Sequence, residues 1–316
     1  MTGVQTCALP ISLVEGRADG ARAGRYRTYR AALGAALNDG GWDGDWYRRA
    51  YYDNGAVLGS AASDECKIDA IAQAWAVLSG AAPAGRARKA LSALERHLVD
   101  EKAGIIRLLT PAFDQTPNDP GYIKGYLPGV RENGGQYTHG ALWAVRALAE
   151  AGHRDRATAL LEMLSPVSRT RTASAVDVYQ AEPYVIAADV YGVAPHLGRG
   201  GWTWYTGSAG WMFRVGVESI LGVTMEDGTA LALRPCLPPE WPTASVIYTV
   251  PATRARYTID YTQQRQLPAR TVAQLDGAAL AIRDRAVVVP LSGMAGEHQV
   301  TVAIGEDLVP KYRERP

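Results

Sequence analysis

The strongest constraint on the fold is a change in hydrophobic spacing near Gly222. Before this point, apolar residues recur at helical intervals, as at Ile68, Ile71, Trp75 and Leu78. The predicted helices cover 16–38, 66–79, 83–98, 138–151, 154–164, 183–191 and 208–221. They pair across short breaks, and successive helix hairpins of this kind can close into a barrel with long loops at one end.

After Gly222 the apolar residues alternate instead. Short runs of this kind lie at 230–233, 245–250, 256–261 and 286–289, and around Val300 and Val302. A strand repeats every two residues, so these runs predict an antiparallel β domain of the sandwich type. The fold class is therefore mainly α with C-terminal β. We expect a helical catalytic-type barrel domain over 13–221 and a β-sandwich-like domain over 222–316.

The first twelve residues, MTGVQTCALPIS, look foreign to the rest of the chain. They resemble translated sequencing-adapter read-through, and they lack the charged start and the length of a signal peptide. We therefore treat 1–12 as an artefactual leader that packs poorly. On this interpretation the natural protein began further upstream, and the chain is a C-terminal fragment.

Composition removes several function classes. The net charge of +1 gives no basic surface for nucleic acid, and no apolar run reaches the roughly 18 residues that a membrane span needs. Three widely spaced cysteines favour a reducing, cytoplasmic compartment. The aromatics comprise 16 Tyr and 8 Trp against 2 Phe, a bias that suits a surface gripping sugars, although Trp and Tyr also serve in cores.

The segment from Gly121 to Trp143 combines six glycines with aromatic and paired polar residues. Glycines allow tight turns and close backbone approach, so the polar groups of such a loop can converge on a ligand between aromatic walls. An ordinary surface loop is the alternative interpretation.

An anion site is predicted where Thr206 would cap a helix starting near Ser208 and Gly207 would let a ligand approach the backbone. Unpaired N–H groups at a helix start attract phosphate. His139 lies at a second predicted helix start and could donate to the same anion. A plain N-cap and a structural histidine are the alternatives.

Several carboxylates could hydrogen-bond sugar hydroxyls: Asp64, Glu65, Asp69, Glu132 and Glu182. For Asp64 and Glu65 the alternative is charge compensation at a helix N-terminus. The chain has no HExxH, CxxC, P-loop or GxSxG pattern, so no motif supports a metal, nucleotide or serine-hydrolase site, and we expect no cofactor.

Five stretches together resemble glycoside hydrolase family 94: WDGDWYRRAYYDNGAVLGS, ECKIDAIAQAWAVLSG, GYIKGYLPGVRENGGQYTHGALWAV, EPYVIAADVY and GRGGWTWYTGSAGWMFRV. That family includes cellobiose and chitobiose phosphorylases and the C-terminal phosphorylase-like part of cyclic β-1,2-glucan synthases, and the last branch looks most similar. The resemblance implies an (α/α)6 barrel, here incomplete, followed by a β-sandwich-like domain.

The resemblance also implies inverting phosphorolysis of a β-glucoside, with inorganic phosphate as co-substrate and α-glucose 1-phosphate as product. Carried over by motif, His139, Thr206 and Gly207 would hold phosphate. Tyr126, Arg131, Glu132 and Gln180 would line the sugar sites. The implied partners are a β-glucan or β-gluco-oligosaccharide and phosphate, and a homodimer is left open. If the chain is part of a cyclic glucan synthase, the resemblance implies a position on the cytoplasmic face of the inner membrane.

One departure matters. The family's general acid is an Asp in an Asp-Trp-Asn-Asp stretch, and this sequence contains no such stretch. We therefore expect no catalytic acid within the chain and no phosphorolysis by the chain alone. The alternatives are a barrel hydrolase that uses water and a non-catalytic carbohydrate-binding or structural module.

Overall fold

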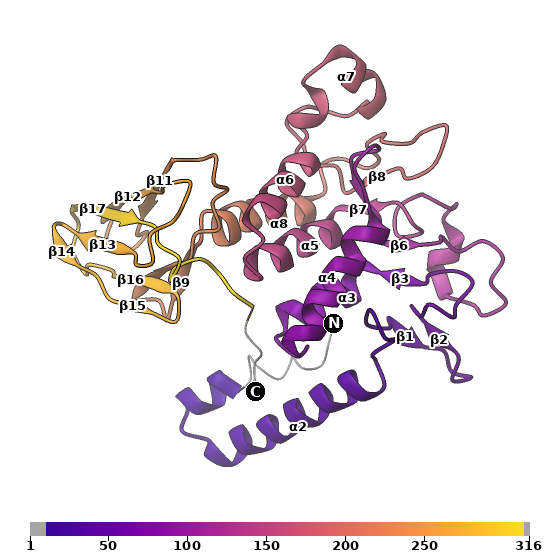
Figure 1. Cartoon of the computed structure of the whole chain (residues 1–316), viewed down its shortest axis with the longest axis horizontal. Helices are drawn as coiled ribbons and strands as arrows, with labels where there is room; N and C mark the ends of the chain where they lie inside the picture. The colour runs from indigo at the N-terminus through magenta and orange to yellow at the C-terminus, as the bar shows by residue number, and fades with distance from the viewer. Residues whose placement is uncertain (1–10, 313–316) are drawn as a thin grey trace. The chain divides into compact units, whose positions relative to one another are not determined.

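The computed structural model describes residues 11–312 of the chain, which form two compact units (Figure 1). The first unit holds the described residues up to Ala147, then Glu162–Trp211 and Tyr312; the second holds Leu148–Leu161 and Met212–Lys311. Of the predicted leader, 1–10 lie outside the described residues, while Ile11 is buried in a helical segment. No helix within residues 11–312 combines the length and apolar character needed to cross a bilayer.

The predicted helices are present except the one over 183–191. Their bounds are α2 Gly20–Asp39, α3 Ala70–Leu78, α4 Ala84–Leu98, α5 Thr138–Glu150, α6 Arg154–Leu164, α7 Ala173–Tyr179 and α8 Thr206–Arg214. A π-helical turn, η3 (Val215–Ile220), continues α8. α3 begins at Ala70, later than the predicted 66–79 helix, because the Asp69 carboxylate accepts hydrogen bonds from the Ile71 and Ala72 N–H groups and so caps the helix N-terminus. α3 and α4 pack as a hairpin, burying Leu94 and Leu98.

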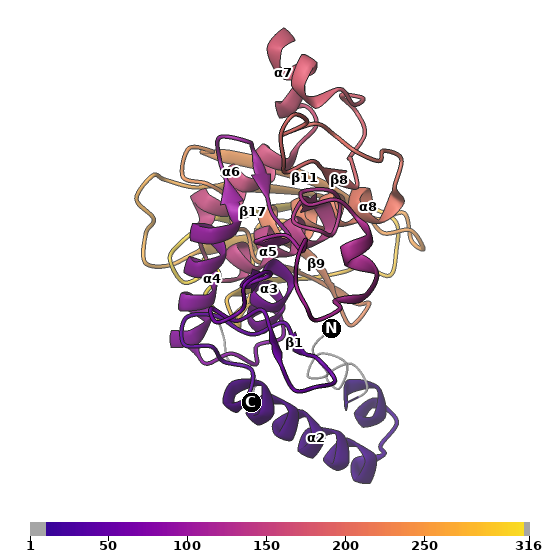
Figure 2. The same cartoon turned by 90° about the vertical axis from the view of Figure 1, so that its right-hand side faces the viewer.

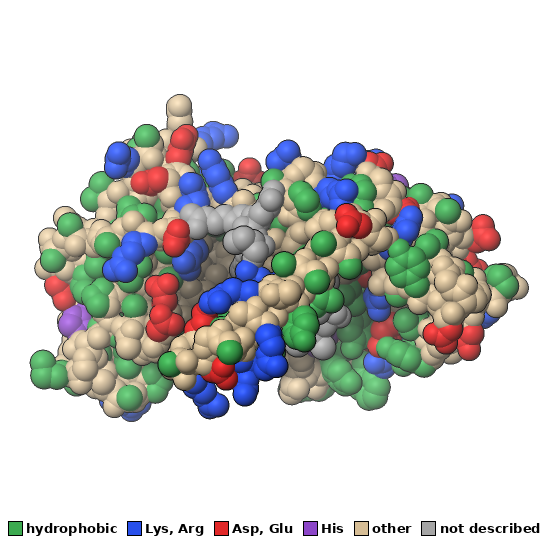
Figure 3. Space-filling view, turned by 90° about the horizontal axis from the view of Figure 1, so that it is seen from below, with side chains coloured by type: hydrophobic (Ala, Val, Ile, Leu, Met, Phe, Trp, Pro, Cys, Tyr) green, Lys and Arg blue, Asp and Glu red, His purple; other side chains and the backbone are tan. Residues whose placement is uncertain are grey.

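α2 is the least buried helix of the first unit. Asp19 caps its N-terminus, and Ala23 is its one buried residue. Its far end is fixed by Asn38, which donates to the Ala81 carbonyl and accepts from the Tyr47 hydroxyl. Figure 3 faces this helix and shows Lys and Arg side chains gathered around it.

The predicted helix over 183–191 is wrong. This stretch begins with a turn at 183–184 and leads into strand β8 (Asp189–Val190), although its apolar spacing resembles that of a helix. Backbone pairing explains the difference: β8 pairs with β7 (Gln136–Tyr137), and Val190 bridges to Gly200 on its other side. The helix lies earlier, as α7, which Thr172 caps and which stands away from the other helices of the unit in Figures 1 and 2.

Short strand pairs and 3-10 turns hold the loops of the first unit. The pairs are β1 (Ala50–Tyr51) with β2 (Val57–Leu58), β3 (Ile68–Asp69) with β6 (Leu109–Thr110), β4 (Val99–Asp100) with β5 (Ile105–Ile106), and β7 with β8. The 3-10 turns are η1 (Gly121–Gly125) and η2 (Ser168–Thr170).

The second unit contains two sheets, as the alternating runs predict. One has the order β15-β16-β10-β9, from Ile282–Arg283, Ala286–Pro290, Ala230–Leu233 and Val223–Glu226. The other has the order β11-β12-β17-β13-β14, from Thr243–Thr249, Arg256–Thr262, Glu297–Ala303, Val272–Leu275 and Ala278–Ala279.

The expectation of purely antiparallel pairing is wrong at one place, because β12 and β17 run parallel. The chain reaches β17 after passing through the other sheet, so β17 enters beside β12 in the same direction. Tyr257 links the two sheets: its hydroxyl accepts from the Ser292 N–H and donates to the Pro290 carbonyl at the end of β16. Alternate residues such as Ile259 and Val300 are buried, which gives the five-stranded sheet one apolar face.

Candidate active site

Backbone pairing brings three of the predicted motif stretches together in the first unit. Residues 131–139 supply β7, the stretch 182–191 supplies β8, and 198–206 runs along the other edge of β8. The Ala188 N–H donates to the Trp202 carbonyl and the Thr138 N–H donates to the Ala188 carbonyl. Segments that are far apart in sequence therefore meet through a few main-chain hydrogen bonds.

Asn133 fixes the glycine-rich loop. Its side chain accepts from the Phe113 N–H at 2.7 Å and donates to the carbonyls of Phe113 and Tyr126, each at 2.8 Å. The side chain is fully buried, and these hydrogen bonds all go to backbone groups. The loop between η1 and β7 is therefore held in one conformation, which positions Tyr126, Arg131 and Glu132.

His139 and Gly207 lie in direct proximity. His139 is the second residue of α5, as predicted, and its Nε2 faces Gly207 so closely that a Cβ on Gly207 would collide with it. The imidazole stacks on Tyr137 with ring centroids 5.3 Å apart and meets the edge of Trp143 at 6.3 Å. Burial lowers the pKa of His139, which favours the neutral imidazole at neutral pH.

The helix start at this point differs by two residues from the prediction. α8 begins at Thr206 itself, so Thr206 and Gly207 are its first two residues and Thr206 is not the cap. N–H groups in the first turn of a helix have no partner within the helix and carry its positive dipole end. His139 Nε2 thus lies at the start of a nine-residue helix.

Arg131 lies between two aromatic rings. Its guanidinium carbon is 5.4 Å from the ring centroid of Tyr126 and 5.1 Å from that of Trp202. Its Nε lies 3.5 Å from Glu132 Oε2, an ion pair without hydrogen-bond geometry. Three of the predicted sugar-site residues are therefore neighbours. Tyr126 and Trp202 hold the guanidinium plane by cation–π contact, while Glu132 balances its charge.

Asp189 is a member of this site that the sequence reasoning missed. Its side chain is 1% exposed; Oδ1 accepts from the Trp202 N–H at 3.0 Å, and Oδ2 has no hydrogen-bond partner among the described residues. Burial raises the pKa of Asp189, while the Trp202 N–H and the nearby Arg131 charge act against that rise. The available signal was an acidic residue inside the otherwise apolar run VIAADVY.

Gly201 makes room for this carboxylate, since a Cβ at that position would collide with both Asp189 oxygens. We call Arg131, Glu132, His139 and Asp189 the open cluster. Each has a buried polar atom without a hydrogen-bond partner within residues 11–312: Arg131 Nε, Glu132 Oε2, His139 Nδ1 and Asp189 Oδ2.

Gln180 is not joined to the open cluster by any of its hydrogen bonds. It ends α7 with a φ of 51°, and its amide donates to the Asp177 carbonyl at 2.9 Å. Its exposed side chain points to its own helix end. Its predicted place in the sugar site stays a prediction.

Two of the other candidate carboxylates have structural roles. Asp69 is fully buried, caps α3 and pairs with Arg49, so it cannot reach a sugar. The Glu65 carboxylate accepts hydrogen bonds from the N–H groups of Asp114, Gln115 and Thr116. These groups belong to a loop, so Glu65 does not compensate the charge of a helix N-terminus either.

Asp64 is exposed and precedes the start of α3 by six residues, so it is not in a first helical turn either. Glu182 is partly exposed, and its carboxylate accepts a hydrogen bond from the Trp204 indole N–H at 3.0 Å.

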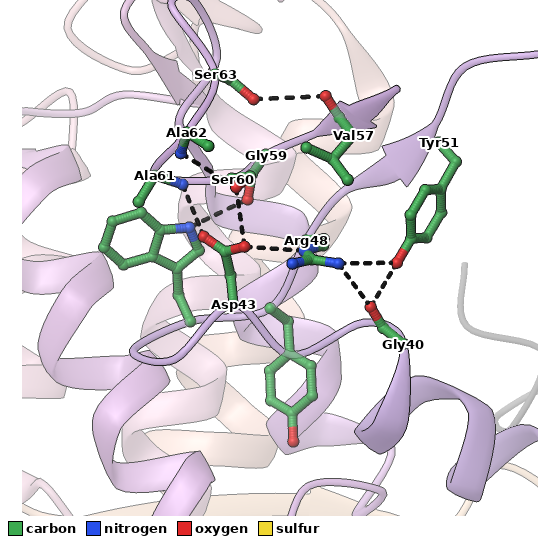
Figure 4. A network of polar contacts seen from close by, with 12 residues as sticks. Gly40, Asp43, Arg48, Tyr51, Val57, Gly59, Ser60, Ala61, Ala62 and Ser63 are labelled. Atoms are coloured by element: carbon green, nitrogen blue, oxygen red, sulfur yellow. Dashed lines mark hydrogen bonds and ion pairs between the residues drawn. The ribbon is translucent and has the colours of Figure 1, made fainter. Parts of the chain in front are cut away.

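The stretch 42–55 forms a separate polar network around Asp43 (Figure 4). Asp43 accepts from Arg48, from the Ser60 hydroxyl and from the Ala61 N–H, at 2.7–2.8 Å. Arg48 also donates to the Gly40 carbonyl and the Tyr51 hydroxyl. Although burial opposes the effect, these hydrogen bonds and the charge of Arg48 lower the pKa of Asp43. We call this set the Asp43 network.

The glycosyl hydrolase 94 superfamily catalytic-domain model matches residues 7–222. The chain belongs to this family. The match begins inside the stretch that we expected to be foreign, and it ends where the alternating pattern starts.

Curated relatives agree with this family. Cyclic beta-(1,2)-glucan synthase NdvB of Rhizobium meliloti is 49% identical over 77% of this chain, and solabiose phosphorylase of Paenibacillus borealis is 35% identical over 67%. N,N'-diacetylchitobiose phosphorylase of Vibrio proteolyticus is 28% identical over 84%. The chain spans 8%, 27% and 32% of the lengths of these three relatives, respectively.

Proposed function

We propose that this chain supplies the phosphate site and part of the sugar site of an inverting β-glucoside phosphorylase of the cyclic β-1,2-glucan synthase type. The observation that carries the proposal is the contact between His139 Nε2 and Gly207 at the start of α8. An imidazole donor and first-turn N–H groups around one point form a binding site for a small oxyanion. A hydrolase that uses water has no need for such a site.

The proposed reaction follows from this arrangement. Phosphate held by His139, Thr206 and Gly207 attacks the anomeric carbon of the terminal glucose, and the glycosidic C–O bond breaks on the opposite face. The products are α-glucose 1-phosphate and a glucan shortened by one unit. Arg131 and Glu132, with Tyr126 beside them, bind the sugar, and Gln180 is a further candidate. A carboxylic acid must protonate the leaving oxygen.

We place that acid outside these 316 residues, because the sequence has no Asp-Trp-Asn-Asp stretch. The chain alone would bind phosphate and glucan without turnover. In the complete enzyme, residues 13–221 would form part of an (α/α)6 barrel and 222–316 a β-sandwich domain, with a second copy as a possible partner. Free, buried Cys66 and Cys236 are compatible with a reducing, cytoplasmic setting.

Phosphate binding to the 316-residue chain tests the site. Isothermal titration with inorganic phosphate should give saturable binding that His139→Ala weakens about 10- to 100-fold, since a hydrogen bond to a charged group contributes about 1.5–3 kcal/mol. His153→Ala, which removes an exposed histidine of the second unit, is the matched control and should bind normally. Equal phosphate affinity in the His139 variant and the control would refute the phosphate site.

Turnover tests the missing acid. The chain should release no glucose 1-phosphate from a β-1,2-glucan in phosphate buffer. Extending the gene upstream to include an Asp-Trp-Asn-Asp stretch should restore release, and an Asp→Asn change at the family's general-acid position should abolish it again. Release by the 316-residue chain itself would show that the acid lies within it.

A further inference from the structure

Exposed aromatic side chains gather on one loop of the first unit and on the segment beside it. Trp202, Trp204 and Tyr205 lie in the loop that leads into α8, and Tyr184 lies in the segment that leads into β8. Trp204 is 69% exposed and Tyr184 is 74% exposed. Large apolar side chains that stay in water are informative when they cluster.

Trp204 is held in place despite an unfavourable backbone conformation. Its φ of 60° lies in the left-handed region, which a bulky side chain adopts rarely because the conformation is strained. Its indole N–H donates to Glu182 Oε1 at 3.0 Å, and its ring meets Tyr184 edge-on with centroids 6.3 Å apart. The contacts that fix the indole therefore leave it facing solvent.

The neighbouring tryptophan has a different role. The Trp202 ring covers the guanidinium of Arg131, while the Trp202 backbone N–H donates to Asp189 in the open cluster. Two residues further on, Trp204 contacts Glu182 instead. The same loop thus presents one indole to the proposed sugar pocket and a second indole outside it.

We propose that Trp204, Tyr184 and Glu182 form an accessory sugar subsite, which binds a glucose unit of a glucan chain beyond the unit held at Arg131 and Glu132. The ligand class rests on the proposed function. A pyranose ring offers C–H groups on its face and hydroxyls at its edge. The indole can stack on the face while the second carboxylate oxygen of Glu182 accepts an edge hydroxyl.

The exposed carboxylate favours a glucan over a protein as the occupant. Hydrogen bonds from the Glu182 N–H and the Trp204 indole lower the pKa of Glu182, so the group is ionised at neutral pH. A protein surface without a matching donor would strip water from that charge, which is unfavourable. A hydroxyl-rich ligand replaces the lost water hydrogen bonds directly. The subsite therefore predicts a preference for chains over disaccharides.

The test uses the 316-residue chain and β-1,2-gluco-oligosaccharides from the disaccharide to the hexasaccharide, with affinities measured by titration calorimetry. The expected result is an affinity that rises about tenfold with chain length, which corresponds to about 1.4 kcal/mol for the added aromatic contact. Trp204→Ala should remove this rise and leave the disaccharide affinity unchanged. Glu182→Gln, which keeps an acceptor for the indole, should reduce the rise only in part.

Two further variants serve as controls. Trp204→Gly relieves the left-handed backbone, so it should fold at least as stably as the parent and still lose the rise. Trp241→Ala removes a partly exposed tryptophan of the second unit and should bind like the parent.

The outcomes are separable. A length-dependent rise that survives in both Trp204 variants overturns the subsite, as does an equal loss at every length, including the disaccharide. Failure of the parent chain to bind any oligosaccharide, with phosphate binding intact, overturns the subsite but leaves the phosphate site standing. Loss of phosphate binding as well would refute the proposed function. A Trp204 variant that changes only self-association, seen by sedimentation, would assign the surface to a protein contact and overturn the subsite.

Discussion

The Asp43 network and the open cluster are two polar regions of the same unit that are built in opposite ways. In the Asp43 network both carboxylate oxygens accept hydrogen bonds, and Arg48 has neutral acceptors besides its ion pair. In the open cluster four side chains each keep a buried polar atom without a partner within the described residues. A closed network stabilises a fold, whereas buried polar atoms without partners are unfavourable unless water or a ligand satisfies them.

The largest expected effect comes from a change in the Asp43 network. Asp43→Ala leaves Arg48, the Ser60 hydroxyl and the Ala61 N–H without their acceptor, and we expect a loss of about 2–4 kcal/mol in unfolding free energy. Urea denaturation of the 316-residue chain measures it. Phosphate affinity of the folded variant should match the parent. A large change in phosphate affinity without a stability loss would reverse the roles assigned to the two regions.

The matching change in the open cluster should raise the unfolding free energy rather than lower it. Asp189→Asn keeps an oxygen for the Trp202 N–H and removes a charge that burial disfavours. The pKa of Asp189 is raised in the folded state, so the folded protein binds this proton more tightly than the unfolded chain. Stability of the parent is therefore lost as pH rises from the ordinary value of 3.8 through the raised folded value.

The Asn variant lacks this loss. Relative to the parent it should gain stability with rising pH, by on the order of 1 kcal/mol at neutral pH, because a buried group without a full set of partners is unfavourable. Thermal melts between pH 4 and pH 8 measure the difference, with Asp64→Asn, an exposed site, as the control. A parent that is more stable than the variant at every pH would mean that Arg131 compensates the carboxylate fully.

The smallest effect concerns His139. Burial lowers its pKa, so its contribution to stability is present above the ordinary value of 6.5 and is lost as pH falls below it. A bound phosphate would favour the charged imidazole and raise this pKa. NMR titration of the His139 ring with phosphate should show the rise, and chloride at equal ionic strength should not. An unchanged titration curve would separate His139 from the anion.

Much of the fold could be predicted because local pattern and tertiary role agree. The strands β10, β12 and β16 begin at the predicted residues, since alternation places one face of each in the apolar interior. The same reasoning failed for 183–191. The spacing of Val185, Ala188 and Tyr191 resembles that of a helix, but hydrogen bonds to segments distant in sequence decide the conformation.

The site was predictable only in its parts. Sequence motifs pointed to His139, Arg131 and Gly207, and the structure brings His139 and Gly207 together. Asp189 and Trp202 were missed because their importance arises from pairing across β8 and from the cation–π contact, which have no local signature.

The position of β17 has a consequence for how the protein is made. It is the last strand of its sheet in the chain, yet it lies between β12 and β13. A ribosome releases β12 and β13 first, and until 297–303 emerge their facing edges have no partner. Unpaired edges recruit other strands, so the nascent second unit is exposed to aggregation until residues 297–303 have emerged, and it benefits from a chaperone over that interval.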